Sequence, residues 1–351
     1  MTRASDEAHV AAQNAEDARL VGLVYVNDAD AGIRRRRAGK GFVYLDADGS
    51  RIADRSVIER IRQLAIPPAY TDVWICPNPR GHVQATGRDA RGRKQYRYHP
   101  RWRAVRDLGK FTRVVDFGSR LPRLRRQLTH DLKLPGLPRE KVLATVVSLL
   151  SETLMRVGNA KYRDENKSYG LTTLLARHVE FLRGRAMVRY RGKSGLRHAV
   201  AIDNSRLVCL LRRCQQLPGQ HLFQYMDDDS APKPIDSGMV NDYLFSAMAG
   251  EFTAKDFRTW GATVQAIAVL AEIPLPEPPE ERTLAMLVNE AVGSVAKALR
   301  NTPTVCRNSY IHPRVISGWK DGELHQAISP ADVRFPRKLE RATLHFLDSS
   351  P

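Results

Sequence analysis

The sequence predicts an α+β protein with a small β-rich N-terminal domain and a larger, mainly α-helical C-terminal domain that contains one β-hairpin. Short apolar runs separated by Gly, Pro and Asp clusters are typical of strands and turns, and they fill the first part of the chain. Apolar residues at helical spacing dominate the rest. The predicted divisions are a flexible leader over residues 1–19, the β-rich domain over 20–105 and the mainly helical domain over 106–351.

Strands and turns alternate in the predicted N-terminal domain. Ser56 and Glu59 have the spacing of a capping box, so a short helix is expected to run to about Ala65, before Pro67 and Pro68. On both sides of this helix, apolar runs bounded by turn residues predict strands. These strands are Gly41–Leu45, Val73–Cys76 and His82–Thr86.

Helical spacing is clearest in two parts of the second domain. Apolar residues recur every three or four positions between residues 142 and 157, and Gly158 is a suitable C-terminal stop. Thr253 and Asp256 form a second capping box. The helix that follows is expected to reach about Leu270 and to present Arg258 in its first turn.

A β-hairpin interrupts this helical pattern. Ala186–Arg191 and Arg197–Ile202 are two β-like segments that flank Gly192-Lys193-Ser194-Gly195. This connection places Lys193 at the tip of the hairpin. Asp203 or Asn204 can cap the helix that comes next.

Prolines divide the C-terminal part of the chain. Residues 273–279 are rich in Pro and predict a stiff linker, and apolar spacing over 284–295 predicts another helix. Thr302 followed by Pro303 has the pattern of an N-cap and a first helical residue. The short helix that begins there contains Tyr310 and ends before Pro313.

The net charge is the most informative bulk property. Hydrophobic residues make up 42% and charged residues 27% of the 351, as in globular proteins, but 56 Lys and Arg against 38 Asp and Glu give a formal charge of +18. Such a field favours a polyanionic partner, either nucleic acid or an anionic membrane surface. The sequence lacks a basic amphipathic anchor, a lipidation signal and a long apolar run, so nucleic acid is favoured and no membrane partner is expected.

The cysteines and the N-terminal segment predict a cytoplasmic protein. The four cysteines form no CxxC pair, which is typical of free thiols in a reducing compartment and gives no support for a zinc site. Residues 1–19 are polar and lack the apolar stretch of a secretory signal.

Basic residues are concentrated in two stretches. The first is Arg34-Arg35-Arg36-Arg37 with Lys40, and the second is Arg88–Arg106, where Gln95, Tyr96, Tyr98 and Trp102 are interleaved with Arg and Lys. Cationic side chains neutralise phosphates, and amides and tyrosines add hydrogen bonds. A solvated basic face is the alternative for any run of charge, but the high net charge favours contact with nucleic acid.

Several kinds of catalytic site lack support in the sequence. The patterns GxxxxGK[ST], GxSxG, HExxH and DxDxDG, which mark nucleotide, hydrolase, zinc and calcium sites, do not occur. Asp227–Asp229 is a tight acidic cluster, but it lies in a Pro-rich stretch where a solvated loop is expected rather than a two-metal site. Neither a metal nor a nucleotide cofactor is therefore predicted.

Phosphoryl transfer without a metal remains compatible with this chain. It requires cations around the non-bridging oxygens, an acid for the leaving oxygen and a nucleophile. Arginine suits the first task because its planar fork contacts two oxygens, a hairpin lysine suits the second, and a tyrosine suits the third. Residue type alone does not identify the members of such a site, since a single helical Arg is usually exposed and a single Tyr usually packs in a core.

Longer segments of the sequence are more specific. In chain order they are Arg88–Tyr98, Leu154–Tyr162 with its continuation Glu165–Thr172, Gly192–Gly195, Lys255–Gly261 and Asn301–Tyr310. Together they resemble the poxvirus-like, bacterial branch of the type IB DNA topoisomerases. The resemblance covers about residues 20–345, and the ordered set is far more specific than any single segment.

This resemblance implies a role for each matched residue. Arg156, Arg258 and Asn301 are expected to hold the scissile phosphate and its transition state. Lys193, assisted by Arg156, is expected to protonate the leaving 5′-hydroxyl, and Tyr310 to attack and form a 3′-phosphotyrosyl intermediate. The free 5′ end then swivels, torsion is released, and the hydroxyl attacks back.

The resemblance also predicts how DNA is bound. A monomer is expected to form a C-shaped clamp around duplex DNA in a cytoplasmic, nucleoid-associated setting. The residues expected to contact DNA are Gln95, Tyr96, Tyr98, Lys161 and Tyr162, together with Arg93 and Lys94 of the basic stretch.

Asn301 departs from a common family pattern. Many type IB enzymes carry His at this position, whereas the bacterial branch carries Asn. Asn can donate a hydrogen bond to a phosphate oxygen but cannot shuttle a proton. We therefore expect Asn301 to be a positioning residue, and the alternative is that it helps Thr302 to cap the helix.

Two other functions fit part of the pattern. A tyrosine recombinase shares the Arg, Lys and Tyr chemistry, but the His-x-x-Arg box of recombinases is absent, because Lys255-Asp256-Phe257 precedes Arg258. A non-catalytic DNA-binding protein needs the charge but has no need for Tyr310.

Overall fold

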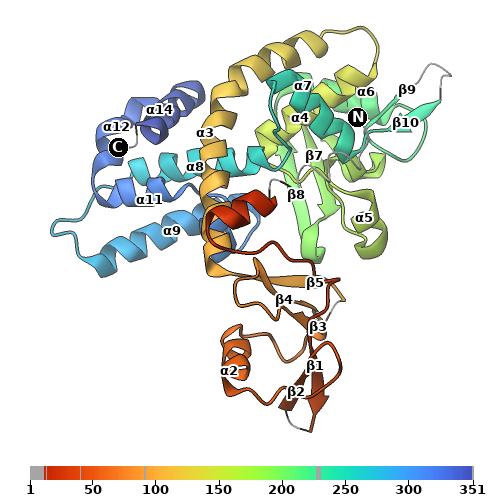
Figure 1. Ribbon diagram of the computed structural model, residues 1–351. Coiled ribbons are helices and arrows are strands. Elements are labelled where there is room, and N and C mark those ends of the chain that lie inside the picture. Colours follow the sequence, from red (N-terminus) through yellow and green to blue (C-terminus); the bar gives the residue numbers. More distant parts are fainter. Residues whose placement is uncertain (1–11, 13, 40, 91, 227–230, 350–351) are drawn as a thin grey trace. The chain divides into compact units, whose positions relative to one another are not determined.

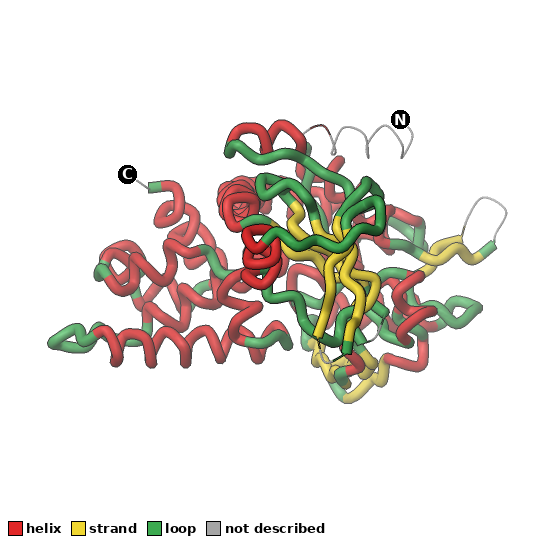
Figure 2. Tube along the Cα trace, turned by 60° about the horizontal axis from the view of Figure 1, so that its bottom comes forward, coloured by secondary structure: helices red, strands yellow, loops and turns green. Residues whose placement is uncertain are grey.

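The computed structural model describes residues 12, 14–39, 41–90, 92–226 and 231–349, and the chain divides into two compact units, Met1–Lys110 and Phe111–Pro351 (Figure 1). Both units contain antiparallel sheets, and most helices lie in the second (Figure 2). The predicted mixture of helices and strands is confirmed.

A five-stranded antiparallel sheet forms the first unit, with strand order β2-β1-β3-β4-β5. Helix α2, Arg55–Gln63, buries Ile61 against the apolar side chains of Ile33 and Ile75. The strands are β1 (Ile33–Ala38), β2 (Gly41–Leu45), β3 (Thr71–Ile75), β4 (Val83–Arg88) and β5 (Lys94–Tyr98).

Strands β1 and β5 are additions to the predicted strands, because their sequences IRRRRA and KQYRY have few apolar residues. In β1, Arg35 is half-buried, since its guanidinium stacks on Phe42 and donates to the carbonyl oxygens of Pro67 and Tyr70 at 3.1 and 2.6 Å. A run of arginines thus forms an interior strand of this sheet, and one of the arginines has main-chain partners.

Two expectations, one about α2 and one about the N-terminal segment, need correction. Asp54, not Ser56, caps α2, since its carboxylate accepts the Ser56 N–H at 2.8 Å. Residues 14–20 are helical, and Ala18 is buried with Leu23 and Trp102, so part of the predicted flexible leader is packed. Residues 1–11 and 13 lie outside the described residues.

The second unit consists of helices around a three-stranded antiparallel sheet of order β6-β7-β8. The sheet contains the predicted hairpin, β7 (Arg185–Arg191) and β8 (Arg197–Ile202), and one further strand, β6 (Val179–Leu182). Strands β9 (Gln224–Met226) and β10 (Pro232–Pro234) pair as a two-stranded sheet, and residues 227–230 connect them in the sequence. The predicted acidic loop Asp227–Asp229 falls within 227–230 and lies outside the described residues.

The helices of this unit share one large apolar core. Helix α3, Pro100–Asp131, includes residues of both units. The others are α4 (Arg139–Thr153), α5 (Ala160–Asn166), α6 (Ser205–Gln215), α7 (Ser237–Met248), α8 (Asp256–Ala271), α9 (Glu281–Leu299), α10 (Pro303–Ser309), α11 (Pro313–Lys320), α12 (Glu323–Ala327), α13 (Pro330–Val333) and α14 (Pro336–Asp348).

Several helix ends agree with local sequence signals. Asn204 caps α6, and Thr302 caps α10 with Pro303 as the first helical residue. Asp256 opens α8 and its carboxylate accepts the Thr253 N–H at 2.7 Å, but Lys255 and not Thr253 is the N-cap, so the predicted capping box is only partly formed. The prediction that α10 contains Tyr310 is wrong by one residue, because this helix ends at Ser309 and Tyr310 is its C-cap.

Helix α4 ends earlier than predicted. Its last residue is Thr153, and Leu154 adopts a left-handed conformation with φ of 52°, so Gly158 is not the helix stop. Gly158 instead has φ of 101° and packs against Gly170, where an added Cβ on Gly170 would lie 2.6 Å from Gly158. The segment after Leu154 therefore leaves the helix with Arg156 on a non-helical backbone.

Candidate active site

The residues predicted to be catalytic come from four parts of the second unit. Arg156 follows α4, Lys193 lies in the single 3₁₀ turn between β7 and β8, and Arg258 is in the first turn of α8. Asn301 connects α9 to α10, and Tyr310 ends α10. Direct contacts join Arg156 to Asn301 and Arg258 to Tyr310, and Lys193 shares a cavity with Arg156.

Arg258 is the most buried of these side chains, at 5% exposure. Its guanidinium donates to the carbonyl oxygen of Leu154 and, at 2.9 Å, to that of Leu299. These carbonyls end α4 and α9, and the C-terminal end of a helix stabilises a cation. The burial of this charge is therefore balanced by two helix ends rather than by a carboxylate.

Arg156 and Asn301 form a direct pair. Arg156 donates from Nη2 to Oδ1 of Asn301 at 2.7 Å, across 145 positions of sequence. The Nδ2 of Asn301 is buried and, within the described structure, has no hydrogen-bond partner. Thr302 alone caps α10, through an Oγ1 that accepts the Val305 N–H at 3.3 Å, so the helix-capping interpretation of Asn301 is not supported.

Tyr310 packs against Arg258. The guanidinium carbon lies 5.2 Å from the centre of the Tyr310 ring. Burial raises the pKa of Tyr310, but the positive charges of Arg258, Arg156 and Lys255 lower it by more, so its pKa falls below the usual value. A lowered pKa makes the phenolate, which is the stronger nucleophile, easier to form.

The backbone of Tyr310 is fixed by Thr263 of α8. The Thr263 hydroxyl donates to the Tyr310 carbonyl oxygen at 3.1 Å and accepts the N–H of His312 at 3.2 Å. Thr263 is fully buried, so this hydroxyl makes its hydrogen bonds within the core. The same helix thus positions Arg258 and the main chain of the tyrosine that it contacts.

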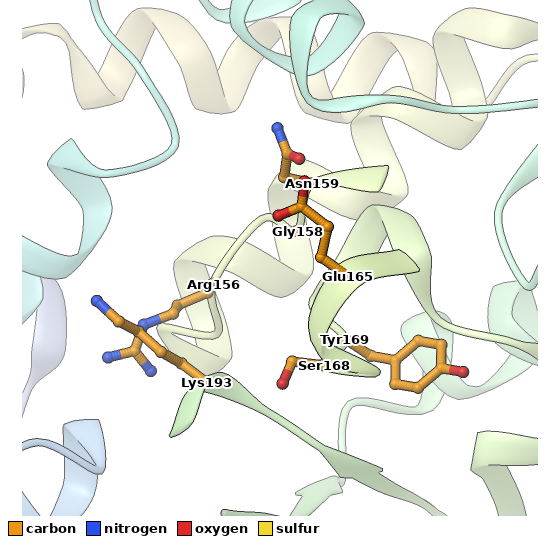
Figure 3. A pocket seen from close by; sticks show the side chains of 7 residues that line it. All are labelled: Arg156, Gly158, Asn159, Glu165, Ser168, Tyr169 and Lys193. Atoms are coloured by element: carbon orange, nitrogen blue, oxygen red, sulfur yellow. The ribbon is translucent and has the colours of Figure 1, made fainter. Parts of the chain in front are cut away.

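Lys193 and Arg156 line one open cavity of about 430 Å³. Their side chains extend toward the same side of it (Figure 3). The remaining lining residues are Gly158, Asn159, Glu165, Ser168 and Tyr169. Lys193 is exposed.

A smaller cavity of about 100 Å³ also contains Arg156 in its lining, together with Arg258 and Arg300 among others. Arg300 donates from Nη1 to Nδ1 of His198 at 2.8 Å and also to the carbonyl oxygen of Ala199. The sequence did not single out Arg300 or His198. The two residues are 102 positions apart, so no local sequence pattern indicates their contact. The position of Arg300 directly before Asn301 is the one feature that could have drawn attention to it.

Most candidate DNA-binding residues of the first unit lie on the edge strand β5, and Arg93 directly precedes it. Tyr96 and Tyr98 are 45% and 37% exposed, share one face of the strand, and stack with ring centres 5.8 Å apart. Gln95 alternates to the other face, is half-buried and donates to Asp89 at 2.9 Å. The three predicted contacts therefore do not share one face of the sheet.

The neighbouring cations Arg93 and Lys94 are paired with carboxylates. Arg93 lies 2.8 Å from Asp89, and Lys94 lies 2.6 Å from Asp28. Lys94 also lines a groove of about 540 Å³ on this sheet. The predicted contacts Lys161 and Tyr162 are on α5, but their side chains lie outside the described part of the structure.

Among the described residues, no helix is both long and apolar enough to cross a membrane. No group of three or more His, Cys, Asp or Glu side chains among these residues is arranged to hold a metal ion.

Comparison with known proteins identifies the family. The model of the eukaryotic DNA topoisomerase I catalytic core matches residues 99–327, and that of the bacterial DNA topoisomerase IB N-terminal domain matches residues 41–89. The chain is 34% identical to DNA topoisomerase 1B of Acanthamoeba polyphaga mimivirus over 285 residues, 80% of this chain and 85% of the viral protein. It is 22% identical over 291 residues to DNA topoisomerase I of Monkeypox virus, covering 79% and 86%. The chain therefore belongs to the type IB DNA topoisomerase family.

Proposed function

We propose that this enzyme relaxes positively and negatively supercoiled DNA by cutting one strand through Tyr310 and resealing it, without ATP or a metal ion. The main support is the cluster in which the Tyr310 ring packs on Arg258 while Arg156 binds Asn301. A nucleophile held among fixed cations suits attack on a phosphodiester, where negative charge develops on the phosphate oxygens.

In the proposed reaction, the Tyr310 oxygen forms a bond to phosphorus as the bond between phosphorus and the 5′ oxygen breaks. Arg156 and Arg258 stabilise the charge on the non-bridging oxygens, and Asn301 donates from Nδ2. The phenolic proton passes to water, and Lys193, assisted by Arg156, gives a proton to the 5′ oxygen. The products are a 3′-phosphotyrosyl bond and a free 5′-hydroxyl.

Resealing reverses these steps. The 5′-hydroxyl attacks phosphorus, the phosphotyrosyl bond breaks, and Tyr310 regains a proton. Because one ester replaces another in each direction, no ATP is needed. Between the steps the free 5′ end rotates and releases torsion of either sign.

We further propose that a monomer closes around duplex DNA as a C-shaped clamp and acts in the cytoplasm on the nucleoid. The net charge of +18 and the exposed tyrosines of β5 support a duplex as the partner.

Relaxation of supercoiled plasmid in EDTA without nucleotide tests this proposal. Wild type is expected to relax both signs of supercoil and to yield a covalent protein–DNA adduct when denatured during turnover. Tyr310→Phe, which keeps the ring against Arg258, is expected to bind DNA normally and to do neither. A wild type that binds DNA but neither relaxes it nor forms an adduct would overturn the proposal in favour of a plain DNA-binding protein.

An assay of strand exchange between two marked duplexes distinguishes a topoisomerase from a tyrosine recombinase. A topoisomerase is expected to reseal the strand that it cut and to leave the marks unexchanged. Efficient exchange at matched sites would instead indicate a recombinase.

A further inference from the structure

His198 on β8 occupies a position between two elements that present candidate catalytic residues. It is 7% exposed and stacks on Tyr190 of β7, with ring centres 4.8 Å apart and planes at 18°. The same two residues are cross-strand partners in the hairpin. The imidazole is therefore a rigid part of the sheet and not a mobile surface group.

One side of this ring faces the start of the Lys193 turn. A Cβ added to Gly192 would lie only 2.4 Å from Nε2 of His198, so the ring touches the backbone just before Lys193. Gly192 is itself buried, and its N–H donates to the Leu196 carbonyl oxygen at 2.8 Å. The position of this backbone, from which Lys193 extends, thus depends on the ring.

The other side of the ring binds the residue before Asn301. Nδ1 of His198 must accept the 2.8 Å hydrogen bond from Arg300, because a guanidinium can only donate. Arg300 also donates to the Ala199 carbonyl oxygen, so it holds β8 at two points. It adopts a left-handed conformation, φ 52°, at the end of α9, and Asn301 follows directly.

The charge state of His198 suits this arrangement. Burial, followed by the positive charges of Arg300, Arg156 and Arg258, lowers the pKa of His198 to about 4. The ring is therefore neutral near pH 7, with Nδ1 free of a proton and Nε2 carrying one.

We propose that His198 is a positioning residue for the reaction: its neutral imidazole joins the base of the Lys193 hairpin to the α9–α10 connection, so that Lys193 and Asn301 stand at one phosphate. This inference rests on the proposed function, because it assigns Lys193 the protonation of the leaving oxygen. His198 itself touches no reacting atom and acts through its neighbours.

Replacing the bridging 5′ oxygen with sulfur provides the decisive measurement. A thiolate leaves without being protonated, so a loss of proton donation slows cleavage of the oxygen ester but not of the sulfur ester. Cleavage sites are first mapped from wild-type adducts, and single-turnover rates are then measured on both duplexes. Lys193→Ala serves as the reference and is expected to raise the ratio of sulfur to oxygen rates strongly.

His198→Phe keeps the stacked ring but removes the acceptor for Arg300. We expect the rate on the oxygen duplex to fall at least about tenfold, the loss on the sulfur duplex to be much smaller, and DNA affinity to stay within about twofold. His198→Asn, whose Oδ1 can replace Nδ1 as acceptor, is expected to recover part of the rate. His178→Phe, which removes another histidine that contacts a tyrosine ring in the same unit, is expected to leave the ratio unchanged.

An unchanged ratio in His198→Phe would overturn the inference and show that the residue is only a core packing group. A wild type that forms no adduct on either duplex would instead contradict the proposed function, so the two failures are distinguishable.

Discussion

On the N-terminal sheet the cations Arg93 and Lys94 bind carboxylates, whereas in the helical unit Arg156 binds an amide oxygen and Arg258 binds two main-chain carbonyls. The sheet cations are partly exposed, and Arg258 is 5% exposed. Within the described residues, neither Arg156 nor Arg258 has a carboxylate within ion-pairing distance.

The two groups of cations differ in how much of their positive charge is available to a polyanion. A carboxylate neutralises its partner, so a phosphate must displace it before it gains the full attraction, and such exposed pairs contribute little by themselves. Neutral carbonyl and amide oxygens orient a guanidinium without cancelling its charge. The charges of Arg156 and Arg258 are therefore not neutralised by a bound carboxylate, whereas those of Arg93 and Lys94 are partly neutralised.

Removing Arg258, the cation bound to main-chain carbonyls, should have the largest effect on the rate of cleavage. Arg258→Ala is expected to slow covalent adduct formation by about 10³-fold, with DNA affinity changed only a few-fold, because the field acts mainly on the transition state. Arg258→Lys keeps a charge, but one ammonium cannot contact Leu154, Leu299 and a phosphate together, so a loss of about 10²-fold is expected. Single-turnover cleavage and equilibrium binding below the melting temperature measure both quantities. If Arg258→Ala lost DNA affinity as strongly as cleavage rate, Arg258 would act in binding and not mainly on the transition state.

Placing a carboxylate in the helical site should have the next largest effect. Asn301→Asp is isosteric, but it neutralises Arg156 and replaces the Nδ2 donor with an acceptor, so cleavage is expected to slow by about 10²-fold. Asn301→Ala loses the hydrogen bonds of the amide but introduces no opposing charge, so it is expected to slow cleavage by about tenfold, much less than Tyr310→Phe does. Single-turnover rates at neutral pH make the comparison.

Contact with Arg156 should hold the pKa of the introduced aspartate below its usual range, so it stays ionised at neutral pH. Two results would be contrary to this account: equal rates for the Asp and Ala variants, or an Asn301→Ala loss as large as that of Tyr310→Phe.

Removing a carboxylate from the sheet should have the smallest effect, and in the opposite direction. Burial raises the pKa of Asp28, but hydrogen bonds from Lys94 and Thr86 lower it by more, so it is ionised and holds Lys94 at neutral pH. Asp28→Asn frees Lys94 and is expected to tighten DNA binding a few-fold, with a log–log salt dependence steeper by about 0.9.

Asp72→Asn is the matched control, since it makes the same charge change in the same groove, at a side chain that is 75% exposed and 3.4 Å from Arg88. Its effect is expected to be smaller. Equal changes in the two variants would mean that net charge alone matters.

Local turn chemistry made parts of this fold predictable from the sequence. The β7–β8 hairpin and the Thr302-Pro303 helix start depend on residues next to each other, so their signals are short-range. Strands β1 and β5 were not recognisable, because sheet pairing, not apolar content, stabilises sequences such as IRRRRA and KQYRY.

The end of α4 was misplaced because its cause lies far away in the sequence. Leu154 leaves the helix where its carbonyl meets Arg258 and its side chain packs on Gly261, where an added Cβ would lie 2.5 Å away. The same limit applies to the site. Sequence motifs identified the candidate residues. The contacts Arg156–Asn301 and Arg300–His198 could not be predicted, because each joins positions more than 100 residues apart.

The left-handed residues Leu154 and Arg300 end α4 and α9, two residues before Arg156 and one residue before Asn301. Each residue added to a helix turns its end by about 100° and advances it by about 1.5 Å. An insertion or deletion anywhere in α4 or α9 would therefore rotate the following residue away from its partner, even if the apolar core repacked. The lengths of these two helices are thus set by the site at their ends, and loop segments elsewhere in the chain are the places where length can vary.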